Sequence, residues 1–326
     1  MLALGLLGSP RKNGNTSFLL SAFMNELEKS GAQIKVIKAD EKKIIPCIEC
    51  SVCEKEGFCP LDDDMNSEIY PLLRQADIIV AATPIFFYSV PAQLKALIDR
   101  SQALWARRYR LKLNDPNQKF RHGFLLSLGA TKGKNLFEGL HLTIKYFFGA
   151  VGTSLEGSLT YRQIENPEDM RKHPSVLKEV KENANQLIIP FLGRKKILFA
   201  CRENACRSQI ASAFAQHLAG NKLEVISGGS VPADKINPLM VEAMSEKRLD
   251  VAFRKPKSIE EAVAEVKPDI IVTMGCGEEC PFMPGVKIKD WDLPDPAGKP
   301  IDFMRNIRDE IEKKVVGLIK DFELYG

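Results

Sequence analysis

The sequence predicts two consecutive α/β domains, each with a parallel sheet covered by helices. Buried strand patterns alternate with amphipathic helix patterns along both halves of the chain. The alternation stops at Pro190-Phe191-Leu192-Gly193-Arg194-Lys195 and restarts at Lys196. A length of 326 residues suits two domains that each bury a core. We therefore expect domains at residues 1–193 and 194–326.

The first domain contains four segments that we interpret as strands and five as helices. Strands are expected at residues 2–7, 33–37, 77–82 and 124–128. Ile34 and Val36 lie on one face of the second of these strands. Helices are expected at residues 16–29, 62–74, 91–104, 136–148 and 173–189, the second with an N-cap among Asp62–Asp64.

The second domain repeats the alternation over a shorter length. Strands are expected at residues 197–200, 223–227 and 269–274. Helices are expected at residues 208–219, 237–248 and 301–323.

Composition excludes several classes of function. A net charge of +4 is modest and the basic residues are scattered, so no nucleic-acid partner is expected; Arg107–Lys112 is interpreted as a solvated loop. The apolar run Met1–Leu7 is too short for a signal peptide, and no other run could span a bilayer. We therefore expect a soluble, cytoplasmic protein, in which the eight cysteines bind metal or act in catalysis.

The most informative stretch lies between the first strand and first helix of the second domain. The apolar run Ile197–Ala200 leads into Cys201-Arg202-Glu203-Asn204-Ala205-Cys206-Arg207-Ser208, and a helix follows at once. The loop N–H groups then lie at a helix N-terminus, where an oxyanion is favoured. Arg207 can grip two oxygens of that anion. The same positive field favours the thiolate of Cys201, so we predict a nucleophile aimed at a tetrahedral anion.

The first domain has a different anion loop, Gly8-Ser9-Pro10-Arg11-Lys12-Asn13-Gly14-Asn15-Thr16-Ser17, after its first strand. Its hydroxyls, amides, helix N-terminus and single Arg suit a terminal phosphate monoester. The strand at 77–82 is followed by the aromatic loop Thr83–Pro91, which can lie against a flat ring, and Leu128-Gly129-Ala130-Thr131 can close the same crevice.

Four cysteines form a compact run in the first domain. Cys47, Cys50, Cys53 and Cys59 lie within thirteen positions, three of them at three-residue spacing. This run resembles a ferredoxin-type cluster loop more than a zinc site, which usually has two separated CxxC knuckles. An iron–sulfur cluster is the favoured interpretation, and zinc and free thiols are the alternatives.

Three stretches of the first domain, GSPRKNGNT, PIFFYSVPAQLKALIDR and the cysteine run, resemble the flavodoxin-like NAD(P)H-dependent FMN reductases and the iron–sulfur flavoproteins. The resemblance implies FMN, NAD(P)H as electron donor, a homodimer and a [4Fe–4S] cluster on the four cysteines. It also implies which residues hold FMN. The phosphate would be held by Ser9, Arg11, Asn13, Asn15, Thr16 and Ser17, and the ring would be flanked by Pro84, Ile85, Phe86, Phe87, Tyr88 and Ser89, with Gly129 and Thr131 nearby.

The loop at Cys201–Ser208 resembles that of the low-molecular-weight protein tyrosine phosphatases and of the arsenate reductases on the same fold. Ser227-Gly228-Gly229 and Asn237-Pro238 stand where such folds place supporting turns. The resemblance implies that Asp295, in WDLPDPAG, is the general acid, with Asp292 a weaker candidate.

Reduction of arsenate requires thiols beyond the nucleophile, because two electrons must leave the protein as a disulfide forms. Cys276 and Cys280 in MGCGEEC offer two, and Cys206 offers a third. MGCGEEC and WDLPDPAG resemble the arsenate reductases, although Cys276 and Cys280 are spaced more closely than is usual for a cysteine relay, so their order stays open.

We therefore expect an arsenate reductase acting through Cys201, Arg207, Ser208 and Asp295, fused to an FMN-dependent NAD(P)H oxidoreductase that re-reduces the disulfide. The anion is arsenate or phosphate, and thioredoxin or a small thiol is an alternative source of electrons. One alternative function is a tyrosine phosphatase joined to an independent flavin reductase. Another is a redox-sensing electron-transfer flavoprotein that binds anions without turnover.

Overall fold

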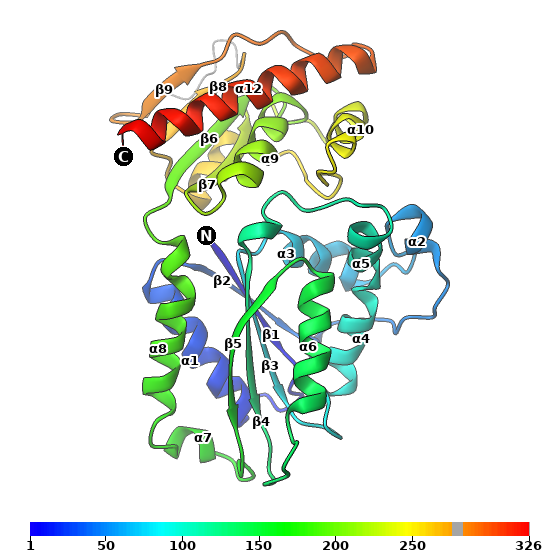
Figure 1. The fold of residues 1–326 in the computed structure, drawn as a ribbon, viewed down its shortest axis with the longest axis vertical. Coiled ribbons are helices and arrows are strands. Elements are labelled where there is room, and N and C mark those ends of the chain that lie inside the picture. The colour runs from blue at the N-terminus through cyan, green and yellow to red at the C-terminus, as the bar shows by residue number, and fades with distance from the viewer. Residues whose placement is uncertain (276–282, 326) are drawn as a thin grey trace. The chain divides into compact units, whose positions relative to one another are not determined.

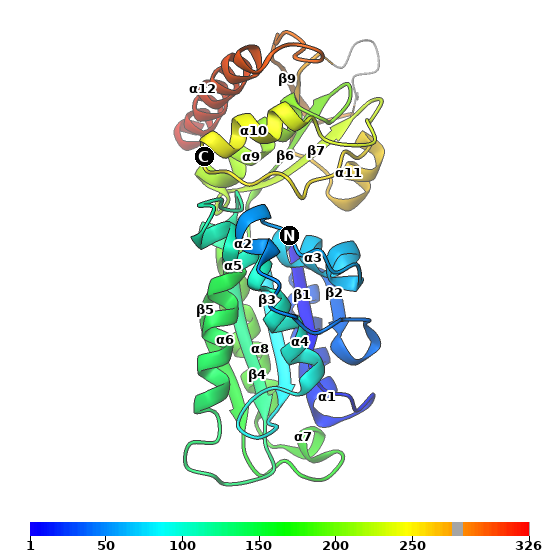
Figure 2. The ribbon, with the colours of Figure 1, turned by 90° about the vertical axis from the view of Figure 1, so that its right-hand side faces the viewer.

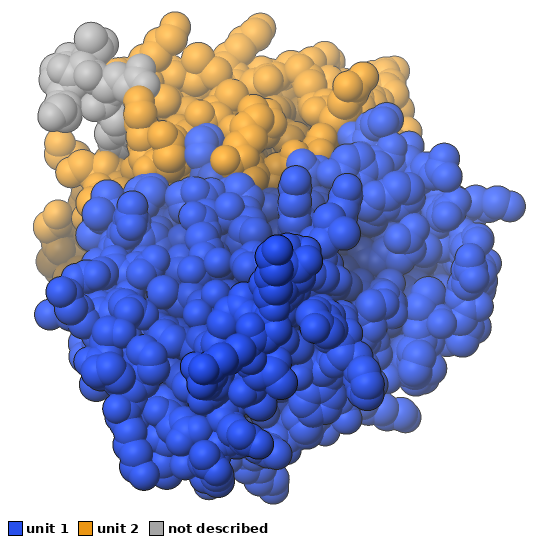
Figure 3. Space-filling model, turned by 60° about the horizontal axis from the view of Figure 1, so that its bottom comes forward, with its two compact units in different colours: residues 1–112, 120–192 blue, residues 113–119, 193–326 orange. Residues whose placement is uncertain are grey.

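The computed structural model describes residues 1–275 and 283–325, with side chains to residue 321. The chain forms two compact units, which are coloured separately in Figure 3. Unit 1 comprises residues 1–112 and 120–192, and unit 2 comprises residues 113–119 and 193–326. Each unit is an α/β structure with one parallel sheet (Figures 1 and 2), which confirms the predicted fold class.

Unit 1 has a five-stranded parallel sheet in the order β2-β1-β3-β4-β5, the flavodoxin-like order. Alternate residues of β1 enter different cores: Leu4 and Leu6 pack with α3 to α6, whereas Ala3 and Leu7 pack with α1 and α8. The strands are β1 Leu2–Leu7, β2 Gln33–Lys38, β3 Ile78–Pro84, β4 His122–Leu128 and β5 Ser154–Tyr161.

The helices of unit 1 cover both faces of this sheet (Figure 1). One long helix was expected at residues 91–104, but the structure has two, which meet at Ser101. The carbonyl of Arg100 accepts a hydrogen bond from the Tyr70 hydroxyl at this break. The helices are α1 Asn15–Lys29, α2 Val52–Glu56, α3 Tyr70–Gln75, α4 Ala92–Arg100, α5 Gln102–Tyr109, α6 Glu138–Ala150, α7 Asp169–Lys172 and α8 Val176–Ile188, and a π-helical turn at Met65–Ile69 precedes α3.

Unit 2 has a four-stranded parallel sheet in the order β7-β6-β8-β9. Ile197, Phe199 and Cys201 on one face of β6 pack with α9, α10 and α12. Leu198 and Ala200 on the other face pack with α11. The strands are β6 Lys195–Cys201, β7 Leu223–Gly229, β8 Ile270–Thr273 and β9 Lys287–Asp290, and the helices are α9 Arg207–Ala219, α10 Pro238–Glu246, α11 Ile259–Glu265 and α12 Ile301–Tyr325.

A short segment from the middle of the sequence, residues 113–119, belongs to unit 2. Asn114 forms a parallel bridge with Leu249, with hydrogen bonds to the backbone of Arg248 and Asp250. His217 of α9 lies against the Pro116 carbonyl, and burial and then the charge of Lys119 lower the pKa of that imidazole. Unit 2 is therefore built from two separate stretches of the chain.

Several observed elements were not expected from the sequence: β5, β9, α11 and the short helices α2 and α7. The basic cluster at Arg107–Lys112 also differs from the predicted solvated loop. It begins within α5, and Arg107 and Arg108 donate hydrogen bonds to the carbonyls of Gly57 and Gly149. No helix in the described part of the chain combines the length and apolar character that a bilayer span requires.

Candidate active site and cofactor sites

The loop between β6 and α9 presents main-chain donors. Its carbonyls at Cys201, Arg202, Glu203 and Ala205 accept hydrogen bonds from the backbone of residues 230–237. Within the described residues, no hydrogen bond uses the N–H groups of residues 202–207. The loop thus holds a row of unpaired donors at the N-terminus of α9, which is the arrangement that binds an oxyanion.

Cys201 lies at the start of this loop, at the end of β6, and is buried. Its Sγ is 3.0 Å from the Ser208 Oγ, which in turn accepts a hydrogen bond of 2.8 Å from the Asn204 Nδ2. Either atom of the Cys201–Ser208 pair can be the donor, because the Ser208 oxygen keeps its own proton and a second lone pair while it accepts from Asn204. In the direction from Ser208 to sulfur, this hydrogen bond is of the kind that stabilises a negatively charged sulfur.

Arg207 and Asp295 lie together beside the loop. The Arg207 Nη2 is 3.2 Å from the Asp295 Oδ2, and its Nη1 donates to the Leu293 carbonyl. The guanidinium is buried, whereas the Asp295 carboxyl is 55% exposed. Asp292 is exposed, and no hydrogen bond or ion pair among the described residues joins its side chain to the loop. The geometry favours Asp295 over Asp292 as the residue that can protonate an oxygen of an anion held by Arg207.

Two turns predicted to support the loop contact it directly. The Asn237 N–H donates to the Ala205 carbonyl. A Cβ on Gly229 would lie 2.7 Å from the Arg202 carbonyl oxygen and 2.8 Å from the Asn204 nitrogen. Only glycine therefore allows β7 to pass this close to the loop.

Of the three additional thiols of the predicted relay, the structure describes only Cys206. The Cys206 Sγ lies 3.1 Å from the Met304 Sδ in the core of unit 2. Burial, and then the charge of Cys201, raise the Cys206 pKa, which disfavours its thiolate; the predicted catalytic role of Cys206 stays a prediction. Cys276 and Cys280 lie outside the described residues. The last residue before them, Gly275, has a positive φ, and a Cβ there would lie 2.9 Å from the Arg207 Nη1.

In unit 1, the predicted phosphate loop joins β1 to α1. Gly14 occupies the N-cap of α1 and provides no side-chain cap, so the first N–H groups of this helix have no partner among the described residues. Ser9 is buried and its Oγ accepts a hydrogen bond from the Arg11 N–H, whereas Arg11 and Asn13 are exposed and Thr16 is buried.

The Asn15 side-chain amide forms hydrogen bonds with the backbone of Asn166 and Met170, so it holds the segment at residues 166–170 against the loop. The backbone of this loop fits an anion.

The predicted ring-binding loop is an exposed aromatic turn after β3. Phe86 and Ser89 close the turn with two backbone hydrogen bonds, and Phe87 and Tyr88 have positive φ angles. Phe87 is 100% exposed. The Ile85 N–H donates to the Leu128 carbonyl, and a Cβ on Gly133 would lie 3.3 Å from the Tyr88 hydroxyl. The turn thus lies beside the loop containing Gly129 and Thr131, at the carboxyl ends of β3 and β4, as expected for a ligand crevice.

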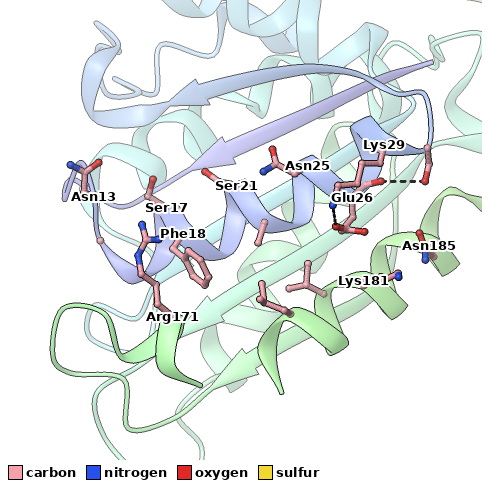
Figure 4. A pocket seen from close by; sticks show the side chains of 15 residues that line it. Asn13, Ser17, Phe18, Ser21, Asn25, Glu26, Lys29, Arg171, Lys181 and Asn185 are labelled. Carbon is pink, nitrogen blue, oxygen red and sulfur yellow. Dashed lines mark hydrogen bonds and ion pairs between the residues drawn. The ribbon is translucent and has the colours of Figure 1, made fainter. Parts of the chain in front are cut away.

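A groove of about 890 Å³ extends from the phosphate loop along α1 and α8 (Figure 4). Asn13, Gly14 and Ser17 line one end. Farther along, Ser21 and Asn25 continue the same face of α1, opposite Lys181 and Asn185 of α8 (Figure 4). This groove was not predicted from the sequence, although its signal is the polar four-residue spacing of Ser17, Ser21 and Asn25.

The four cysteines of the compact run lie between β2 and the π-helical turn before α3. Cys47 and Cys50 are exposed, and Cys53 and Cys59 are half-buried against the core. Burial, and then the charges of Cys59, Cys47 and Cys50, raise the Cys53 pKa. Among the described residues, no three Cys, His, Asp or Glu side chains are gathered closely enough to hold a metal ion. The loop thus supplies four thiol donors without gathering them into a finished site.

Two family models match separate parts of the chain. Residues 1–139 match the family model for NADPH-dependent FMN reductase, and residues 196–324 match that for low molecular weight phosphotyrosine protein phosphatase. An iron-sulfur flavoprotein of Methanocaldococcus jannaschii is 40% identical over 104 residues, which are 32% of this chain and 53% of that protein. The chain spans about half the length of the iron-sulfur flavoproteins that it matches.

The second half of the chain also matches an arsenate reductase over nearly its whole length. Arsenate reductase 2 of Staphylococcus epidermidis is 34% identical over 127 residues, which are 38% of this chain and 95% of that protein. A solved structure of a thioredoxin-dependent arsenate reductase from Corynebacterium glutamicum is 33% identical, covers 47% of this chain and 78% of its own, and has a TM-score of 0.37. The chain is therefore a fusion of a domain of the NADPH-dependent FMN reductase family with a domain of the low molecular weight phosphotyrosine protein phosphatase family that belongs with the arsenate reductases.

Proposed function

We propose that this chain reduces arsenate to arsenite at Cys201, with electrons supplied to the resulting disulfide by its own flavin domain. The reduction of arsenate at Cys201 is supported by one observation above all. The loop that follows this buried cysteine has N–H groups with no partner among the described residues, and the Cys201 sulfur contacts Ser208. Arg207 and Asp295 complete the site on one side. Such a site stabilises a tetrahedral dianion and the nucleophile that attacks it.

In the proposed first step, the Cys201 sulfur forms a bond to arsenic and one oxygen leaves as water. Arg207 neutralises the remaining oxygens, and Asp295 supplies a proton to the departing one. A second thiol then attacks the Cys201 sulfur. The sulfur–arsenic bond breaks with its electron pair on arsenic, so that arsenite leaves and a disulfide remains.

We propose Cys276 or Cys280 as the source of the second thiol. A Cβ on Gly275 would lie 2.9 Å from the Arg207 Nη1, so the chain passes close to Arg207 one residue before Cys276. Cys206 is a poor alternative, because its sulfur packs against Met304 and its raised pKa disfavours the thiolate.

The residues of unit 1 fit FMN. The uncapped N-terminus of α1, with Ser9, Arg11 and Ser17 nearby, would hold the phosphate. The exposed turn at Phe86–Ser89 would lie against the ring. When bound, FMN accepts two electrons from NAD(P)H and passes them on. We propose that these electrons regenerate the two thiols, either directly or through thioredoxin or a small thiol.

Three further features belong to the same proposal. The thiols of Cys47, Cys50, Cys53 and Cys59 have the donor chemistry of a [4Fe–4S] cluster, which would carry electrons one at a time. We expect a homodimer, since flavodoxin-like reductases commonly pair, and we expect no nucleic-acid or membrane partner. We also propose a cytoplasmic location, because a reducing compartment keeps thiols such as those of this chain free.

The test is arsenate-dependent oxidation of NAD(P)H by the anaerobically purified chain, with arsenite quantified as product. We expect equal amounts of NAD(P)H consumed and arsenite formed, and no arsenite from Cys201→Ser. If removal of FMN leaves arsenite formation with added thioredoxin unchanged but abolishes NAD(P)H-dependent turnover, the domains are coupled as proposed. If NAD(P)H oxidation is the same with and without arsenate, the coupling is refuted.

The tyrosine phosphatase is the second candidate, because the same loop, Arg207 and Asp295 also suit a phosphate ester. Hydrolysis needs no second thiol. Rapid aryl-phosphate hydrolysis that survives Cys276→Ser and Cys280→Ser, without arsenite formation by the unmodified chain, would favour it. Tight oxyanion binding with neither product would favour the redox-sensing alternative.

A further inference from the structure

The loop that carries the four cysteines is held at both ends by one buried ion pair. Asp63 and Arg100 have fully buried side chains, and the Arg100 Nη1 is 2.6 Å from the Asp63 Oδ2. Arg100 donates to the carbonyls of Ile45, at 2.7 Å, and Leu61, at 3.2 Å. Asp63 accepts from the Ile45 N–H at 2.8 Å. Ile45 precedes the first cysteine and Leu61 follows the last, so one guanidinium joins the two ends of the loop.

Two other side chains hold the loop between these ends. Arg107 of α5 donates to the Gly57 carbonyl at 2.8 Å. The Asn66 amide donates to the Cys59 carbonyl at 3.1 Å and to the Leu61 carbonyl at 2.7 Å. The path of the chain around Cys59 is therefore fixed by protein contacts alone.

Arg100 also has a donor that these contacts do not use. Its Nε is buried and has no hydrogen-bond partner in the described structure. An unpaired donor on a buried guanidinium is costly, and it calls for an acceptor. Cys59 is the nearest thiol along the chain to the Leu61 carbonyl that Arg100 already holds.

We propose that Arg100, oriented by Asp63, is the positioning residue of the cysteine loop, and that its Nε–H donates to the Cys59 sulfur when the loop holds an iron–sulfur cluster. This inference rests on the cluster in the proposed function. A hydrogen bond to a ligating sulfur stabilises the more negative, reduced cluster and raises its potential. We call the contacts of Asp63 and Arg100 with Ile45 and Leu61 the clamp. Loss of the clamp also leaves the cysteine sulfurs less well placed to bind metal, which weakens retention of the cluster.

The first experiment compares the full-length chain with Arg100→Lys, which keeps the positive charge but lacks both Nε and the fork that reaches two carbonyls. Asp99→Asn is the matched control, because Asp99 forms an exposed ion pair with Lys95 on the same helix. We measure iron and sulfide content, the rate of iron loss to a chelator, and the midpoint potential by an EPR-monitored titration. We expect Arg100→Lys to lose iron about 10- to 100-fold faster and to have a more negative potential, and Asp99→Asn to match the unmodified chain. An unchanged potential and rate in Arg100→Lys would overturn the proposal.

A second experiment tests the clamp without any cluster and covers the case in which Arg100→Lys fails to fold. In the metal-free chain, alkylation of each cysteine by iodoacetamide is followed by mass spectrometry. Asn66→Ala removes only an exposed side chain, so it preserves the core. We expect faster alkylation of Cys59 in Asn66→Ala than in the unmodified chain, with Cys50 unchanged, and faster alkylation of Cys59 in Asp63→Asn. Equal rates of Cys59 alkylation in all three proteins would overturn the clamp. If the unmodified chain contains no iron after anaerobic purification, the cluster and the Nε–H donation are refuted, and the alkylation rates decide the clamp alone.

Discussion

Gly229 provides a test of whether the shape of the anion loop creates the site in unit 2. A Cβ at this position would lie 2.7 Å from the Arg202 carbonyl oxygen, 2.8 Å from the Asn204 nitrogen and 2.9 Å from the Glu203 carbonyl carbon. All three atoms belong to the backbone of the loop, so no side chain can rotate away to relieve the contact. Gly229→Ala therefore displaces the loop, whereas the chemical groups of Cys201 and Arg207 stay the same.

The size of the effect follows from these distances. The loop has to retreat by roughly 0.7 Å for the shortest contact to reach an ordinary 3.4 Å. A misplacement of about 1 Å in a catalytic constellation costs on the order of 100-fold in rate. We therefore expect kcat/KM for arsenate to fall by roughly 10- to 100-fold. Overpacking of this kind also costs about 1–3 kcal/mol of stability.

The assay is arsenite formation under single-turnover conditions, together with phosphate affinity by calorimetry and a thermal unfolding curve. Gly317→Ala is the control, because Gly317 lies in α12 and a Cβ added there would meet no atom within 4 Å. We expect it to raise stability by about 0.5–1 kcal/mol and to leave phosphate affinity unchanged. Wild-type phosphate affinity in a folded Gly229→Ala variant would refute the idea that the backbone donors of this loop hold the anion.

Four other substitutions test separate parts of the structure. Asp295→Asn keeps the contact with Arg207 but cannot donate an acidic proton, so kcat should fall by about 100-fold or more with little change in phosphate affinity; an unchanged kcat would exclude Asp295 as the acid. Ser208→Ala removes the hydroxyl 3.0 Å from the Cys201 sulfur, and we expect slower alkylation of Cys201 by iodoacetamide at neutral pH, measured by mass spectrometry; an equal rate would contradict the role of Ser208. Cys206→Ala should keep arsenite formation and lose about 1 kcal/mol of stability, because this thiol packs against Met304; loss of arsenite formation in the folded variant would restore Cys206 to the relay. The Ser175 and Tyr161 hydroxyls lower the pKa of Glu179, so the carboxylate stabilises unit 1 above about pH 4, and this contribution disappears as the pH falls further. In unfolding curves measured at several pH values, Tyr161→Phe should weaken this dependence on acid, whereas the control Glu182→Gln on the same helix should not. Identical curves for the unmodified chain and both variants would refute the assignment.

The sequence predicts best those features that depend on neighbouring residues. The loop from Cys201 to Ser208 is flanked by its own strand and helix, so an apolar run followed by a helical pattern is enough to locate it. The loop between β1 and α1, which is the predicted phosphate loop, can be located in the same way. The parallel sheets follow from the alternation of strands and helices.

Features that depend on distant residues were missed. Asp63 was expected only as an N-cap candidate, but its partner Arg100 lies at the end of α4, and nothing local to either residue indicates the pair. The contact between the Cys206 and Met304 sulfurs was not foreseen either, because Met304 comes from α12, far away in the sequence. The strand β9 is charged and exposed, and pairing with β8 rather than an apolar pattern makes it a strand.

The segment at residues 113–119 has a consequence for how the two units can be separated. The chain passes from one unit to the other after residues 112, 119 and 192, so a protease cut between residues 192 and 193 severs only one of three connections. The upstream fragment would still carry a strand-like piece that hydrogen-bonds to the backbone at Arg248 and Asp250. The two fragments should therefore co-purify after nicking, because residues 113–119 stay paired with the downstream fragment.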